Sequence, residues 1–106
     1  MKIEIDSDVL SAVFAAMDRN HDKWWFSIED CALAWGFERS YFYRRRHLLP
    51  NFGVFDDPDH HAFSRESFMR WVTVPLAKHA REWAALSADE RRQIEKHQVL
   101  KGITVK

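Results

Sequence analysis

The clearest pattern of apolar and polar positions in this chain of 106 residues begins at Ser27. The apolar residues that follow recur at the i, i+3, i+4, i+7 spacing of one buried helix face: Ile28, Cys31, Ala32 and Trp35. Ser27 is a good N-cap, and Asp30 three positions on gives a capping box with Asp in place of Glu. Gly36 then follows, and glycine can reverse a chain in the left-handed conformation without a Cβ penalty. The pattern predicts a short helix that ends in a tight turn.

A second helix is expected from Arg39 to His47, because Pro50 forces the chain out of helical geometry soon afterwards. Its sequence combines aromatic and basic residues: Arg39, Tyr41, Phe42, Tyr43, Arg44, Arg45 and Arg46. Two short helices joined by a glycine-bearing turn indicate a helix-turn-helix, here over residues 27–49. A helix of about ten residues fits the major groove of DNA, which is roughly 12 Å wide.

Three further helical segments are expected around this motif. Asp6 or Ser7 can cap a first helix, which we expect to pack behind the motif through an apolar stripe: Val9, Leu10, Val13, Phe14 and Met17. Ser64 caps a helix in which we expect Trp71 to lie in the core, and Pro75 must kink or break that helix. A capping box from Ser87 to Glu90 predicts a last helix over roughly residues 88–98.

Residues 51–63 have the composition of a turn-rich connection between two aromatic-bearing segments. They contain Gly53, Pro58 and three aspartates, so they predict a β-hairpin or an irregular wing. The expected fold is therefore a single domain over residues 1–106, mainly α with a small β-hairpin wing (α+β). It would have about five helices, with the C-terminal helices at 64–98.

The stretch from residue 25 to residue 66 resembles the winged helix-turn-helix family of excisionases, MerR-type regulator heads and phage small terminase subunits. The residues that carry the resemblance are Trp25 to Ala32, Gly36-Phe37, Arg39-Ser40-Tyr41, Arg44, Leu49-Pro50 and Phe63 to Glu66. It implies that Arg39–His47 is the recognition helix and that 51–63 is the wing.

The expected function is non-catalytic binding of double-stranded DNA, as a transcription regulator or an excisionase-like recombination accessory factor. Residues at the start of a recognition helix usually contact bases, and later cations and tyrosine hydroxyls contact phosphates. The candidate DNA-binding residues are Arg39, Ser40, Tyr41, Tyr43, Arg44, Arg45 and Arg46. The alternative interpretation of the arginine run is a solvated helix end that the helix dipole favours.

The net charge and its distribution are also compatible with a second function. The chain has 16 basic and 16 acidic residues, and a net charge of zero is awkward for a phosphate-binding protein. The charge is segregated, however, because residues 38–50 carry four arginines and one glutamate, whereas residues 51–63 carry three aspartates and no base. Wings of the family are commonly basic. The alternative is a protein-binding adaptor or phage-encoded inhibitor that uses the acidic loop on a basic partner: Asp56, Asp57 and Asp59.

The adjacent Trp24 and Trp25 also favour the protein-binding alternative. Consecutive side chains cannot share one face of a helix or strand, so we expect one of Trp24 and Trp25 to be exposed as a protein-contact anchor. After the break at Pro75, Trp83 can cover the core or form the seam of a homodimer through the C-terminal helices.

No motif in the sequence predicts an enzyme, a cofactor or a metal. Residues 18–22 imitate an EF-hand loop, but Lys23 stands where that loop needs glycine. The adjacent His60 and His61 are interpreted as part of a turn, and Cys31 as a core residue. A single cysteine, an acidic N-terminal segment and the lack of an apolar run of about 20 residues predict a cytoplasmic protein without a membrane span.

Overall fold

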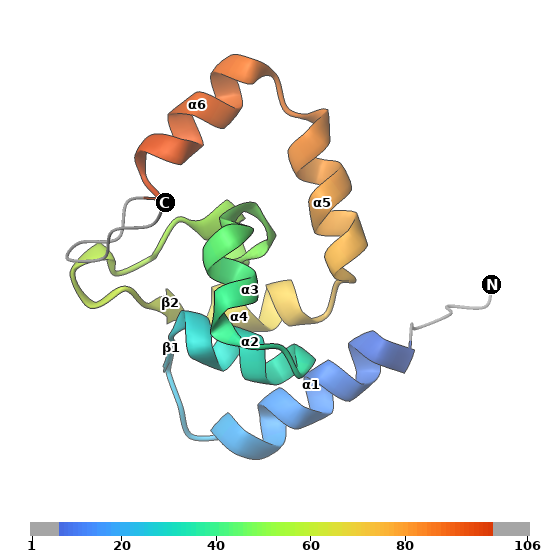
Figure 1. Ribbon diagram of the computed structural model, residues 1–106. Coiled ribbons are helices and arrows are strands. Elements are labelled where there is room, and N and C mark those ends of the chain that lie inside the picture. The colour runs from blue at the N-terminus through green and yellow to red at the C-terminus, as the bar shows by residue number, and fades with distance from the viewer. Residues whose placement is uncertain (1–6, 99–106) are drawn as a thin grey trace.

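The computed structural model describes residues 7–98 and is mainly helical with one small antiparallel sheet, as the sequence predicts (Figure 1). Its helices are α1 (Ser7–Asn20), α2 (Ile28–Trp35), α3 (Arg39–Arg44), α4 (Arg65–Val72), α5 (Leu76–Ala85) and α6 (Ala88–Lys96). Its strands are β1 (Trp25–Phe26) and β2 (Phe63–Ser64), and three 3₁₀ turns are η1 (Arg46–Leu48), η2 (Pro50–Gly53) and η3 (Pro58–His60). Pro75 divides the predicted fourth helix into α4 and α5.

Aromatic side chains from β1, α3 and α4 fill the core. Phe26 and Phe68 stack with their ring centres 4.0 Å apart, and Phe42 packs edge-on against Trp71 at 5.8 Å. The indole N–H of Trp71 donates to the backbone carbonyl of Leu48 over 2.7 Å, so the buried ring has its polar atom satisfied. Trp71 is the core residue that the sequence predicts. The predicted core residue Trp35 is only half-buried.

The predicted apolar stripe of α1 is partly wrong. Val9 is buried as expected, but the rest of the buried face consists of Ala12 and Ala16. The three largest residues of the predicted stripe are exposed: Leu10, Phe14 and Met17. Small side chains let the axes of two helices approach closely, and α1 packs on α2 and α4 through its alanines. The sequence pattern does not distinguish this close packing from packing through large residues.

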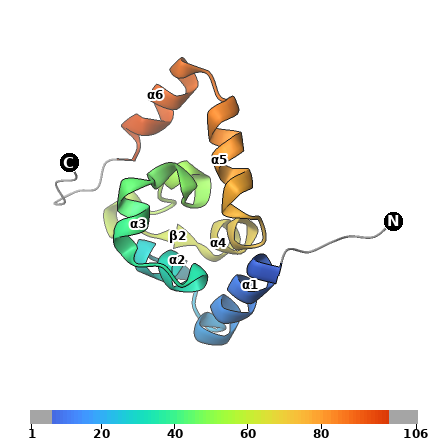
Figure 2. The same cartoon turned by 45° about the vertical axis from the view of Figure 1, so that its right-hand side comes forward.

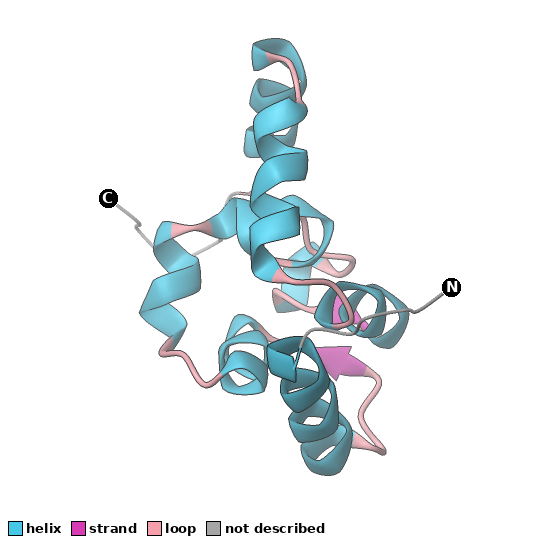
Figure 3. Ribbon diagram, turned by 90° about the vertical axis from the view of Figure 1, so that its right-hand side faces the viewer, coloured by secondary structure: helices cyan, strands magenta, loops and turns pink. Residues whose placement is uncertain are grey.

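The small sheet joins segments on either side of the helix-turn-helix. β1 pairs antiparallel with β2, with Trp25 opposite Ser64 and Phe26 opposite Phe63. The predicted hairpin inside 51–63 is therefore wrong in its pairing. In Figure 3 the two strands lie among the helices that surround them. The pairing brings the entry to α2 beside the entry to α4.

Residues 51–63 form an irregular loop, the second of the two predicted alternatives, and not a hairpin. Pro50 and Pro58 each open a 3₁₀ turn, and a single bridge between Asp57 and Ala62 closes the loop. Asn51 and Phe52 both have a left-handed backbone, with φ of 55° and 56°, which a strand cannot accommodate. Turn geometry thus prevents the two aromatic segments from pairing as strands.

Helices α5 and α6, here called the C-terminal arm, arch away from the other helices (Figures 1 and 2). Neither helix has a buried residue. The arm contacts the rest of the molecule where Trp83 lies 5.5 Å from the rings of His47 and of Phe52. The expected dimer seam through these helices stays a prediction. Within residues 7–98 the longest helix has 14 residues, and none has the length and apolarity needed to cross a bilayer.

Candidate nucleic-acid interface

Helix α2, the first helix of the predicted helix-turn-helix, begins with the predicted cap. The Asp30 amide donates to the Ser27 hydroxyl over 3.2 Å, and the Ser27 amide donates to the Asp30 carboxylate over 2.8 Å. Lys23 adds an ion pair to the same carboxylate at 2.6 Å. At the other end of α2, Gly36 has a φ of 74°, the left-handed conformation expected of it. Both boundaries of α2 are thus fixed by residues that can be recognised in the sequence.

Helix α3 is shorter than predicted. It ends at Arg44, because the backbone leaves helical geometry at Arg45, where φ is −131°, and continues as η1. Gly53 packs directly on this turn, since a Cβ atom there would lie 2.6 Å from the Arg46 carbonyl oxygen. Leu48 and Leu49 are buried immediately afterwards. The burial of this segment draws the chain inward, so the predicted helix to His47 is wrong in its last three residues.

One face of α3 is open to solvent. Phe42 is fully buried, with 0% of its surface exposed, and anchors the helix to the core. Ser40 and Arg44 lie two positions on either side of it, roughly 160° around the helix, and both are exposed. Tyr41 and Tyr43 are half-buried along the flanks. The exposed face is therefore centred on Ser40 and Arg44.

An aromatic contact orients one of the cations beside this face, Arg45. The guanidinium carbon of Arg45 lies 4.2 Å from the centre of the Tyr41 ring, within the range of a cation–π interaction. Among the described residues, Arg39, Arg44 and Arg45 form no ion pair with a carboxylate. A hollow of about 380 Å³ beside them is lined in part by Ser40 and Arg44. Three cations without an ion-pair partner among the described residues, and one hydroxyl, thus lie along α3 and its C-terminal cap.

Arg46 does not join this face. Its Nη1 donates to the backbone carbonyl of Gln98 over 2.8 Å, and the Gln98 side chain donates to the Phe52 carbonyl. Gln98 is only 7% exposed, one of two buried polar residues among those described. The sequence places Arg46 with the DNA-binding arginines, but the structure makes it a tether for the end of the arm. No signal in the sequence indicates this contact, because 52 residues separate the two partners.

His47 lies between the candidate interface and the arm. Its ring stacks on Trp83 at a centre-to-centre distance of 5.5 Å. Burial lowers the pKa of His47 below its usual value, and the positive charge of Arg45 lowers that pKa further. The neutral imidazole is therefore the form that fits this contact.

Two aspartates of the acidic loop, residues 51–63, make hydrogen bonds within the loop or to Ser64 beside it. Asp56 accepts from the Ser64 amide over 2.8 Å and from the side chain of Asn51. Asp57 accepts from the His60 amide and pairs with the His60 ring at 2.7 Å. Asp59 is exposed. Two of the three aspartates expected to contact a protein thus stabilise the loop.

Both tryptophans of the predicted pair are exposed, where the sequence predicted only one. Trp24 is 72% exposed and Trp25 is 49% exposed. The strand is only two residues long, so Phe26 alone is directed into the core while Trp24 precedes the strand. Cys31 is buried, and burial followed by the nearby charge of Asp30 raises the pKa of its thiol. Within residues 7–98 no group of three metal-ligating side chains is gathered.

Comparison of the chain with protein-family models, with curated proteins and with solved structures gave no match in any of the three.

Proposed function

We propose that this protein binds double-stranded DNA without catalysis, through the exposed face of α3, as a transcription regulator or an excisionase-like accessory factor. The observation that supports the proposal is the opposition of Phe42 to Ser40 and Arg44. A buried anchor on one side leaves a polar, cationic surface on the other side that can enter a major groove.

The roles of the residues follow from their positions. Arg39 and Ser40 stand at the start of α3, where base contacts usually arise. Arg44 and Arg45 lie at its end, and Tyr41 orients Arg45 by stacking. We expect Arg44, Arg45 and the Tyr43 hydroxyl to contact DNA phosphates.

Charge also indicates which side of α3 faces the DNA backbone. A hollow of about 620 Å³ next to Arg39 is bordered by Glu29 and Glu38. These carboxylates would repel phosphates on that side. Glu38 also lines the hollow beside Arg44 and Arg45, but Glu29 does not, and neither arginine forms an ion pair with a carboxylate among the described residues. We therefore expect the backbone contacts beside Arg44 and Arg45.

The test is the salt dependence of binding to duplex DNA, measured by fluorescence anisotropy. Replacing Arg44 and Arg45 together by alanine should reduce the slope of log K against log salt by about one unit for each phosphate that the variant no longer neutralises. Arg92→Ala is the matched control, since Arg92 is exposed but pairs with Asp89 on α6. An unchanged slope in the double variant would remove these residues from the interface.

Two further outcomes decide the function itself. Arg46→Ala should leave the slope unchanged, because the Arg46 side chain is bound to Gln98. Wild-type protein that shows no affinity for random duplex DNA at low salt would contradict DNA binding altogether, since non-specific affinity is a general property of such proteins.

A further inference from the structure

A second surface combines exposed tryptophans with a cation. A hollow of about 720 Å³ opens between β1 and the start of α4, here called the Trp hollow. Its lining consists of Trp24, Trp25, Ser64, Arg65, Glu66 and Met69. Exposed paired tryptophans are uncommon on a monomeric surface, and aromatic residues concentrate where proteins bind partners.

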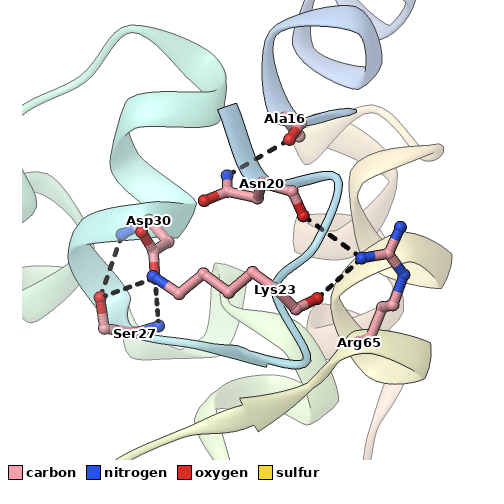
Figure 4. A network of polar contacts seen from close by, with 6 residues as sticks. All are labelled: Ala16, Asn20, Lys23, Ser27, Asp30 and Arg65. Atoms are coloured by element: carbon pink, nitrogen blue, oxygen red, sulfur yellow. Dashed lines mark hydrogen bonds and ion pairs between the residues drawn. The ribbon is translucent and has the colours of Figure 1, made fainter. Parts of the chain in front are cut away.

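Arg65 is held in place within this surface. Its Nη1 donates to the backbone carbonyls of Asn20, His21 and Lys23, at 3.2, 3.1 and 2.7 Å. Figure 4 shows the side chain reaching from α4 to the loop that follows α1. The guanidinium carbon also lies 5.8 Å from the centre of the Trp24 ring. The side chain is ordered before any partner arrives, which lowers the entropic cost of binding.

The charge of Arg65 is not compensated nearby. Carbonyl oxygens satisfy donors but carry no net charge, and Arg65 forms no ion pair within the part of the chain that the structure describes. Lys23 is paired with Asp30 at 2.6 Å, whereas Glu66 is 87% exposed and lies 3.8 Å from Arg70, which makes a weak surface pair. Nε and Nη2 of Arg65 make no hydrogen bond to a described residue, so they are available to an incoming carboxylate.

We propose that the Trp hollow binds a peptide segment of a partner protein in which an aspartate or glutamate stands next to a large apolar residue. The carboxylate would accept from Arg65, and the apolar side chain would pack on Trp24, Trp25 and Met69. The segment bound here carries an acidic residue, whereas the aspartates of residues 51–63 predict a basic partner for a different surface. This site is separate from the α3 face and does not depend on DNA binding.

Charge favours a peptide over a nucleic acid at this surface. A strand of DNA or RNA presents a phosphate at every nucleotide and is bound by rows of lysines and arginines. The Trp hollow has one uncompensated cation among the described residues, and Glu66 lies in its lining. A peptide with a single carboxylate, placed on Arg65, meets less repulsion from Glu66 than a chain of phosphates does.

The test is a titration of the full chain with a capped peptide that contains Phe-Asp-Leu, followed by the indole N–H signals in NMR spectra. The signals of Trp24 and Trp25 should shift, and the matched Phe-Asn-Leu peptide should bind about tenfold more weakly because it lacks the charge-assisted bond. Trp24→Ala and Trp25→Ala should each weaken binding of the aspartate peptide at least several-fold. Both side chains are exposed, so these variants leave the core intact.

Phe14→Ala is the control, because Phe14 is 61% exposed on another helix. It should bind the peptide as the wild type does. Equal affinity for the Asp and Asn peptides, or equal losses in Phe14→Ala and Trp24→Ala, would overturn the proposal. So would a dT oligonucleotide that shifts the same indole signals more strongly than the peptide does. Loss of DNA binding in a separate assay would leave these results unaffected.

Discussion

The same capping box occurs twice in this protein, with different consequences. At the start of α2 the Asp30 amide donates to Ser27 over 3.2 Å, and at the start of α6 the Glu90 amide donates to Ser87 over 3.1 Å. Helix α2 has four buried residues, whereas α6 has none. The cap determines where each helix begins but not whether the helix joins the core.

The contrast between α2 and α6 shows that a well-capped helix need not contribute to the stability of the core. Helices of nine or ten residues are marginal in water without tertiary packing. The arm is connected to the rest through the stacking of Trp83, the hydrogen bonds of Gln98 and the contact of His79 with Trp71, whose carbonyl oxygen lies 3.0 Å from the His79 Nε2 atom. We therefore expect the arm to open locally well below the free energy of global unfolding.

The largest expected effect is a core deletion in α3. Phe42→Ala should lower the free energy of unfolding by about 3–5 kcal/mol, because it leaves a cavity beside Trp71. Trp83→Ala removes an even larger ring from the arm, where the side chain is only half-buried, and should have a clearly smaller effect. Urea denaturation measures both. Similar losses would show that the arm is part of the cooperative core.

Gln98→Ala should have the next largest effect, because it removes the donor to Phe52 and loosens the segment that holds Arg46. We expect a loss of about 1–2 kcal/mol, typical of one buried hydrogen bond. Amide exchange should accelerate in α5 and α6 and stay unchanged in α2 and α4. Uniform acceleration over all helices would contradict a separately opening arm.

The two caps offer a matched pair of variants. Ser27→Ala should reduce the free energy of unfolding by about 1 kcal/mol, since α2 is part of the core. Ser87→Ala removes the same interaction but should reduce only the helicity of α6, measured by circular dichroism. Equal shifts of the urea midpoint in the two variants would contradict the distinction drawn between the two regions.

The smallest expected effect concerns pH. The pKa of His47 is lowered in the folded state, so the folded protein binds this proton more weakly than the unfolded chain does. The stabilisation that neutral His47 contributes is complete above the pKa of an unfolded histidine, about 6.5. It is lost as the pH falls through the lower pKa of His47 in the folded protein. His47→Phe keeps the ring against Trp83 without titrating. Urea midpoints at pH 7.5 and 5.5 should therefore differ less in this variant than in the wild type.

Predictions from the sequence succeeded where the cause is local. Ser27, Gly36 and Ser87 act within four residues of their own positions, and each has the predicted role. The reversal of the chain and the mainly helical content follow from the same kind of signal. The cationic run was also visible, as was Trp71 in the core.

The predictions were wrong where contacts between residues far apart in the sequence determine the local structure. The length of α3 depends on Gly53 packing against Arg46, and the role of Arg46 depends on Gln98. The pairing of β2 with β1 joins residues 37 or more positions apart, so a hairpin within 51–63 was the simpler expectation. The Arg65 tether likewise connects residues more than 40 positions apart.

The sequence by itself determined the starts of α2 and α6, the left-handed turn at Gly36 and the concentration of arginines after it, because caps, glycine conformation and charge act over a few bonds. Only the tertiary structure decided that Arg44 faces solvent while Arg46 holds Gln98, and that Trp24 lies beside an uncompensated Arg65. Burial and long-range hydrogen bonds depend on which segments meet in space, and identical residues two positions apart can therefore have different roles.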